Sequence, residues 1–351
     1  MPVAVERDLD FLAARLHGRR SLLAEGARLD DLCRIRTVDE LARRIVPGCA
    51  VRQAIPFQRH MIDAYLRELG MLAAGVGGAG GDFLGWQRTR FQVENLKVLA
   101  RGMARRLPPE SVKPHLIELP DDLALDLAPY ADGPDGAPLL ARLQSLLPSG
   151  AHLRTALEQS GDAFIDTTEP FLAEAALDRA YLRWLLRHAG AVGGEDGAGV
   201  RRLAEHEAGI FNTMLVIRGR QSYSLPPDLL RAACVPDGVP GRETIEQVIG
   251  AGDEADGLRM LAAQLDSAGA AGFPPEPAAI EALAWNRYLK LANALFRQSQ
   301  MSVGVVIGFA AIRRIELANL ITLCEGMRLG IDPRRLRQRL VPRTGMEAAH
   351  V

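Results

Sequence analysis

The sequence predicts an all-α protein built from three helical repeats, and three observations lead to that fold class. First, one pattern of Tyr, Asn, Gly and Pro occurs three times along the 351 residues. Second, apolar residues recur at spacings of three and four, which is typical of amphipathic helices. Third, the period-two alternation of strands is nearly absent. The hydrophobic content of 48% is enough for a sizeable core.

Each repeat is centred on an Asn that is followed by a Gly seven positions later. The three pairs are Asn95 and Gly102, Asn212 and Gly219, and Asn319 and Gly326. A Tyr precedes each Asn by 30 or 31 residues, and these are Tyr65, Tyr181 and Tyr288. Asn is a poor residue inside a helix unless its amide has partners, so its recurrence predicts a hydrogen bond from each amide to a paired helix or loop. We interpret the three Tyr as packing residues with a hydroxyl partner.

The spacing of these landmarks divides the chain into repeats at 1–117, 118–236 and 237–351. In the first repeat, Thr37 and Glu40 form a capping box that opens a helix over 38–46. Further helices are predicted over 57–73 and 86–101, joined by a Gly-rich loop at 75–85. Gly102 stands where a left-handed residue commonly ends a helix. A short Pro-opened helix follows each Gly after a few residues.

The second and third repeats continue the same helical pattern. Predicted helices of the second repeat cover 139–147, 150–159, 171–188 and 200–218, with a Gly-rich loop at 190–199. Those of the third cover 243–249, 257–265 and 278–298, with a loop at 269–277, and an Arg-rich helix ends the repeat. The most apolar run, 303–312, is about half the length that a membrane span needs, so we predict a buried helix there.

Composition narrows the classes of function. The net charge of −1 provides no basic field for nucleic acid, and no aromatic residues interleave the terminal arginines. Four scattered cysteines predict neither a disulfide framework nor a zinc site and fit a reducing compartment. The charged residues near the N-terminus leave no apolar leader, so we expect no signal peptide.

Charge is distributed unevenly along the chain. Residues 118–180 hold twelve acidic side chains and three Arg, whereas residues 313–343 hold eight Arg and three acidic side chains. Such polarity suits docking onto charged partners, and a solvated surface is the alternative. Within the basic segment we predict Arg334, Arg335 and Arg337 as a possible partner contact.

Three patterns invite a chemical interpretation, and each has a simpler alternative. Asp121, Asp122 and Asp126 form an acidic cluster that resembles a Mg²⁺ site, but the segment is short and no second acidic motif accompanies it. His206 and Glu207 lack the second His of a zinc protease. No Gly-Lys-Ser/Thr follows the Gly-rich stretch 75–85, which therefore does not predict a phosphate loop. We accordingly predict no catalytic residue, cofactor, metal or small-molecule substrate.

Several of these segments resemble one protein family. They are Glu94–Lys97, Glu174–Tyr181, Glu316–Leu320 with the following Gly330–Pro333, and the opening stretch Ala13–Ser21. Together they resemble the C/d subunit family of A-type and V-type rotary ATPases, and the resemblance covers nearly the whole chain. It implies a funnel-shaped protein made of three pseudo-threefold helical repeats.

The resemblance also implies a function. It implies a non-catalytic central-stalk subunit of the rotor, peripheral on the cytoplasmic face of the membrane. A protein in this position couples the central stalk to the membrane proteolipid ring of a proton- or sodium-translocating ATPase or ATP synthase. The alternative is a soluble helical-repeat adaptor that has no connection with ion transport.

Overall fold

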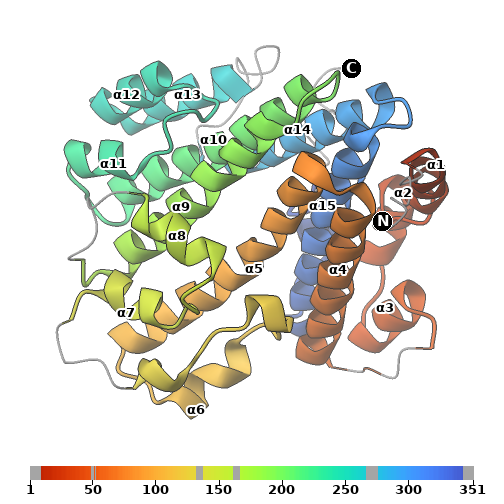
Figure 1. The fold of residues 1–351 in the computed structure, drawn as a ribbon, viewed down its shortest axis with the longest axis horizontal. Helices are drawn as coiled ribbons and strands as arrows, with labels where there is room; N and C mark the ends of the chain where they lie inside the picture. The colour runs from red at the N-terminus through yellow and green to blue at the C-terminus, as the bar shows by residue number, and fades with distance from the viewer. Residues whose placement is uncertain are drawn as a thin grey trace, which may run out of the picture. The chain divides into compact units, whose positions relative to one another are not determined.

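The fold is all-α, as the sequence predicts (Figure 1). The computed structural model describes residues 9–48, 51, 53–131, 137–160, 167–265 and 276–342, and no strand occurs within these residues. The helices are α1 (Leu9–Arg20), α2 (Gly26–Cys33), α3 (Val38–Ile45), α4 (Ala54–Val76), α5 (Gly78–Ala104), α6 (Pro109–Val112), α7 (Leu139–Ser145), α8 (His152–Glu158), α9 (Pro170–Ala191), α10 (Gly197–Gln221), α11 (Pro227–Ala233), α12 (Arg242–Gly250), α13 (Glu254–Leu265), α14 (Pro277–Gln298), α15 (Val303–Arg328) and α16 (Pro333–Arg337). Three short 3₁₀ turns lie between α6 and α7.

The chain forms two compact units, and each is described here by itself. Unit 1 contains residues 1–84, 192–203 and 282–351, and unit 2 contains residues 85–191 and 204–281. The boundary between the units falls within α5, α10 and α14. The division into repeats at 1–117, 118–236 and 237–351 stays a prediction, and so does the funnel.

The core of unit 1 is formed by α4 and α15, which lie side by side (Figure 1). Tyr65 of α4 is 1% exposed, and its hydroxyl donates a hydrogen bond of 3.2 Å to the carbonyl of Ala310 in α15. Residues 304–312 of α15 are all buried, which confirms the predicted buried helix. Each large apolar side chain in this run contributes about 1.5–3 kcal/mol through burial.

In unit 2, α9 packs on α5 through an aromatic contact. Trp86 of α5 stacks on Tyr181 of α9 at a centroid distance of 5.8 Å. The indole nitrogen of Trp86 donates a hydrogen bond of 2.9 Å to the carbonyl of Tyr181. Thus the Tyr helix of the second repeat contacts the Asn helix of the first. The contact between Tyr65 and Ala310 likewise joins the Tyr helix of the first predicted repeat to the Asn helix of the third, but here the Tyr hydroxyl is the donor.

The prediction of a Gly-rich loop at 75–85 is wrong. The chain turns only at Gly77 and Gly78, which take positive φ of 60° and 53°, and α5 already begins at Gly78. A Cβ on Gly80 would lie 2.6 Å from a methyl of Val303. A Cβ on Gly81 would lie 2.6 Å from the carbonyl oxygen of Ala73. These glycines therefore permit close packing inside a helix pair, a role that the sequence alone does not distinguish from loop flexibility.

The predicted loop at 190–199 is also shorter than expected. Helix α9 continues to Ala191 and α10 begins at Gly197, so the connection covers only residues 192–196. Gly199 lies inside α10, where a Cβ would come within 2.8 Å of Leu295. The predicted loop at 269–277 lies largely outside the described residues.

Side chains fix the starts of α3 and α15. The hydroxyl oxygen of Thr37 accepts a hydrogen bond from the backbone N–H of Glu40, which confirms the predicted cap of α3. The start of α15 is capped from far away in the sequence, because Asp196 accepts hydrogen bonds from Gly304 N at 2.8 Å and from Ser299 Oγ at 2.6 Å. Desolvation opposes the charge of Asp196, but these hydrogen bonds and one from Ser302 lower its pKa.

Candidate functional site

The three repeated asparagines form the same bidentate contact, which we call the asparagine clamp. In each clamp the side-chain amide donates to a backbone carbonyl, and its oxygen accepts from the N–H of the same residue. The partners are Ile117 for Asn95, Val235 for Asn212 and Val341 for Asn319. The six distances lie between 2.6 and 2.9 Å. Each clamp thus ties a long helix to a segment 22 or 23 residues downstream.

The turn after each Asn is also the same in all three repeats. The carbonyl of each repeated Gly accepts a hydrogen bond of 2.8–2.9 Å from a backbone N–H five or six residues later, in Leu107, Leu225 and Ile331. The residue before each of these takes positive φ, and these residues are Arg106, Ser224 and Gly330. The turn is therefore built from the backbone, and it reverses the chain after each Asn helix.

The predicted left-handed role of Gly102 is wrong, because Gly102 lies inside α5 and the positive φ falls on Arg106. The three repeated glycines share a different role. A Cβ on Gly102 would lie 2.8 Å from Val112, and a Cβ on Gly219 or Gly326 would overlap the side chain of Leu230 or Leu336. The short helix after the turn packs against the Gly, and this contact excludes a side chain there.

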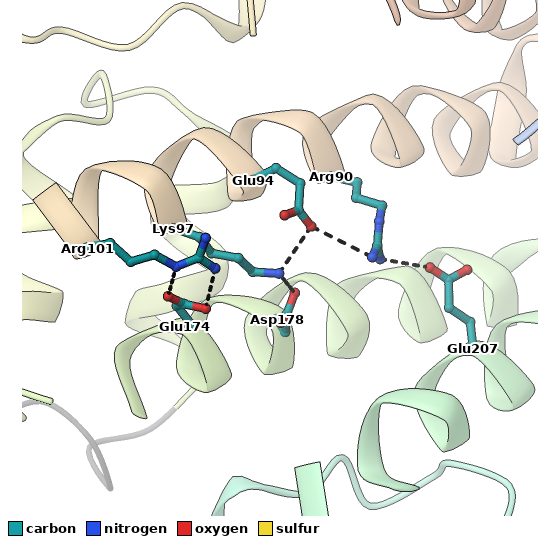
Figure 2. A network of polar contacts seen from close by, with 7 residues as sticks. All are labelled: Arg90, Glu94, Lys97, Arg101, Glu174, Asp178 and Glu207. Atoms are coloured by element: carbon teal, nitrogen blue, oxygen red, sulfur yellow. Dashed lines mark hydrogen bonds and ion pairs between the residues drawn. The ribbon is translucent and has the colours of Figure 1, made fainter. Parts of the chain in front are cut away.

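A network of ion pairs in unit 2 connects α5, α9 and α10 (Figure 2). Figure 2 shows Lys97 between two carboxylates, with its Nζ 3.1 Å from Glu94 and 2.7 Å from Asp178. Arg101 forms a two-pronged pair with Glu174 at 2.6 and 2.8 Å. The network continues from Glu94 through Arg90 at 3.7 Å to the buried Glu207 at 3.4 Å (Figure 2).

The environment shifts the pKa of two carboxylates in this network in opposite directions. Burial raises the pKa of Asp178, although the charges of Lys97 and Arg90 work against the shift. For Glu94, desolvation also favours the protonated form, but the charges of Lys97 and Arg90 outweigh it and lower its pKa. The two carboxylates therefore compete for one ammonium group, and Asp178 is the more costly of the two to ionise.

Part of this network lines a cleft of about 660 Å³, which lies entirely within unit 2 and which we call the α5–α9–α10 cleft. The lining residues from the network are Glu94, Lys97, Arg101, Glu174 and Asp178. Helix α10 contributes Phe211, Met214 and Leu215 to the apolar surface of the cleft. At its edge the rings of Phe171 and Tyr223 stack with centroids 3.9 Å apart, and Tyr223 is 51% exposed. The cleft thus combines apolar and charged surface.

The three terminal arginines do not share one environment. Arg334 and Arg335 are exposed on α16, whose start is capped by Asp332. Arg337 is only 13% exposed in its side chain, and it forms an ion pair of 2.5 Å with Asp30 next to a hydrogen bond to the carbonyl of Pro342. The structure therefore gives Arg337 an internal role, and the first two remain available for a partner.

The acidic cluster at the start of the predicted second repeat, Asp121, Asp122 and Asp126, has structural contacts. Asp122 forms two hydrogen bonds of 2.8 and 2.9 Å with Arg88, and the carboxylate of Asp126 accepts from the N–H of Ala128. Asp121 begins a 3₁₀ turn. In the part of the chain that the structure describes, no group of three His, Cys, Asp or Glu side chains is placed to hold a metal ion.

Three cysteines are free thiols in the structure. Cys33 and Cys324 are buried and Cys234 is half-buried, whereas Cys49 lies outside the described residues. Burial raises the pKa of all three thiols, that of Cys234 to about 12. The thiolate is the reactive form, so these side chains behave as packing residues.

Sequence reasoning missed the polar contacts that join distant segments. Besides the network around Lys97, a second one in unit 1 places Glu68 of α4 between Arg19 at 2.7 Å and Arg313 at 3.2 Å. The partners stand far apart in the sequence. In the sequence, such a contact is indicated only by a charged residue on the apolar face of a predicted helix, and this pattern does not identify the residue that pairs with it.

The fold and the repeated clamps define an all-α protein whose long helices carry one recurrent frame. Over residues 12–339 the chain matches the family described as ATP synthase (C/AC39) subunit, and it belongs to that family. This confirms the resemblance found in the sequence. Comparison with curated proteins gave no match. None of the helices in the described residues is long and apolar enough to cross a membrane.

Proposed function

We propose that this chain is a non-catalytic central-stalk subunit in the rotor of an A/V-type proton- or sodium-translocating ATPase or ATP synthase. It couples the central stalk to the membrane proteolipid ring and lies peripherally on the cytoplasmic face of the membrane. The observation that carries the proposal is membership of the ATP synthase (C/AC39) subunit family over residues 12–339.

The physical properties of the structure support this role. A coupling part must transmit torque, so it needs resistance to deformation more than a pocket for chemistry. Close-packed helix pairs such as α4 and α15 provide that stiffness. The asparagine clamps add fixed hydrogen bonds between helices and the segments after them, which holds the turns in place.

Purification of the tagged full-length chain from native membranes tests the proposal. We expect stalk and ring subunits to co-purify at stoichiometric levels, and the preparation to remain on membranes until detergent is added. The alternative, a soluble adaptor, predicts recovery in the cytosolic fraction with other partners. Absence of ring and stalk subunits from the purified material would refute the proposal.

The exposed arginines of α16 offer a second test. We expect the Arg334→Glu/Arg335→Glu variant to co-purify with fewer stalk or ring subunits than the wild type, and this difference to shrink as salt is raised because charge contacts are screened. Arg337 stays unchanged, since its ion pair with Asp30 is internal. The matched control is Arg201→Glu/Arg202→Glu, which reverses two adjacent exposed arginines of α10. Equal assembly of both variants would make Arg334 and Arg335 ordinary solvated residues.

A further inference from the structure

The α5–α9–α10 cleft carries an inference that is independent of the proposed function. Its wall has apolar residues, with Phe211 and Met214 half-buried at the surface, and the stacked ring of Tyr223 stands exposed at the edge. A groove between helices with an exposed aromatic edge is the kind of surface into which an amphipathic helix places its apolar face. The volume of about 660 Å³ is enough for several side chains.

The charged residues of the cleft indicate the sign of the charge that its occupant carries. Lys97 and Arg101 are neutralised by carboxylates within the network. Arg105 and Arg218 also line the cleft and are exposed, and the described residues show no ion pair for either. Glu169 is the corresponding unpaired acid among the lining residues that the structure describes. Two guanidinium groups are thus available for carboxylates from outside.

Comparison of the repeats indicates that the polar lining is not required by the frame. Lys97 stands two residues after its Asn, and the corresponding positions hold Met214 and Ile321. Asp178 stands three residues before its Tyr, where the other repeats have Ile62 and Trp285. An apolar pair of similar size is often at least as stable as a buried ion pair. The charged pair is therefore a feature of this cleft and not of the repeated frame.

We propose that the α5–α9–α10 cleft receives an amphipathic helix of a partner protein whose apolar face is flanked by acidic side chains. The apolar face lies on Phe211 and Met214 and against Tyr223. The flanking carboxylates bind Arg105 and Arg218. Because Lys97 and Arg101 are already paired, the occupant needs no charge toward them.

Site-specific photocrosslinking in the native host tests this proposal. A photoreactive amino acid replaces Ala104, which is exposed, lines the cleft and ends α5. The matched control replaces Ala74, an exposed alanine near the end of α4. After irradiation, the adduct is isolated on the tagged full-length chain, and the crosslinked partner segment is identified by peptide mass spectrometry.

The expected result is one discrete adduct from position 104 and none from position 74, with an acidic amphipathic helix as the crosslinked segment. The Arg105→Glu/Arg218→Glu variant should reduce the adduct by about tenfold or more, because like charges then face each other across the contact. Circular dichroism checks that this variant folds. No adduct from position 104, an adduct on a basic or entirely polar segment, or an adduct unaffected by the reversal overturns the proposal. Ring and stalk co-purification is scored separately, so the proposed function stands or falls on its own measurement.

Discussion

The asparagine clamp of the second repeat provides the sharpest test of the fold, through the variant Asn212→Ala. Asn212 is 2% exposed, and its amide group satisfies both the carbonyl and the N–H of Val235 at 2.8 and 2.7 Å. Val235 is itself buried, at 1% exposure. The substitution therefore removes both hydrogen-bond partners of Val235 at a place that bulk water does not reach directly.

The magnitude follows from the two backbone groups that lose their hydrogen bonds. A buried donor or acceptor left unsatisfied costs about 1–3 kcal/mol. We therefore expect Asn212→Ala to lower the free energy of unfolding by about 2–6 kcal/mol, with the higher figure reached only if the site does not relax. That is a large share of the roughly 5–15 kcal/mol by which native domains are stable.

Two measurements check this expectation. Urea denaturation gives the change in the free energy of unfolding for the whole chain. Hydrogen exchange at the Val235 amide reports the clamp directly, and we expect its protection to fall strongly because its acceptor is gone. Gln338→Ala is the control, since Gln338 is exposed and the described residues show no hydrogen bond of its side chain.

By the same reasoning, we expect losses of the same sign but smaller size for Asn95→Ala and Asn319→Ala, because these residues make the same pair of hydrogen bonds to Ile117 and Val341, which are only half-buried. A loss below about 0.5 kcal/mol for Asn212→Ala, within the range of ordinary surface substitutions, would refute the calculation. Unchanged exchange at the Val235 amide would refute the assignment of the clamp itself.

Two further predictions concern packing and charge. Gly209→Ala should destabilise the protein by more than the roughly 1 kcal/mol that Ala gains over Gly in a helix, because its Cβ would overlap the backbone of Val239. Gly85→Ala should instead stabilise the protein by about that amount, because a Cβ there meets nothing within 4 Å. Changes in melting temperature of the same sign for both variants would contradict this prediction. Burial raises the pKa of Asp178 above its ordinary 3.8, so its contribution to stability is fully present below pH 3.8 and is lost as the pH rises through the raised pKa. The Asp178→Asn variant should therefore be at least as stable as the wild type at neutral pH, and any gain in its free energy of unfolding should disappear on acidification. A decrease in the free energy of unfolding of about 3 kcal/mol or more at neutral pH would show that the ion pair with Lys97 dominates.

Local sequence patterns predicted the fold class, the recurrence of Asn, Tyr and Gly, and most helix positions. Periodic apolar residues and caps such as Thr37 act within one or two helical turns, so they are visible in a local stretch of chain. The family resemblance also rested on such local segments, and comparison confirmed it. The repeated Asn indicated a structural role because the same residue type at the same repeat position suggests that each amide makes the same hydrogen bonds.

The roles of the glycines and the partners of the charged side chains became visible only in the folded chain. Gly80 and Gly102 looked like loop and helix-end residues, because the close approach of Val303 and Val112 is not encoded beside them. Asp196 caps a helix that starts about a hundred residues later. Arg337 turned out to be bound internally, whereas its neighbours on α16 are exposed. Packing contacts and ion pairs join residues that are distant in the chain, and a local sequence pattern does not specify which distant residue makes the contact.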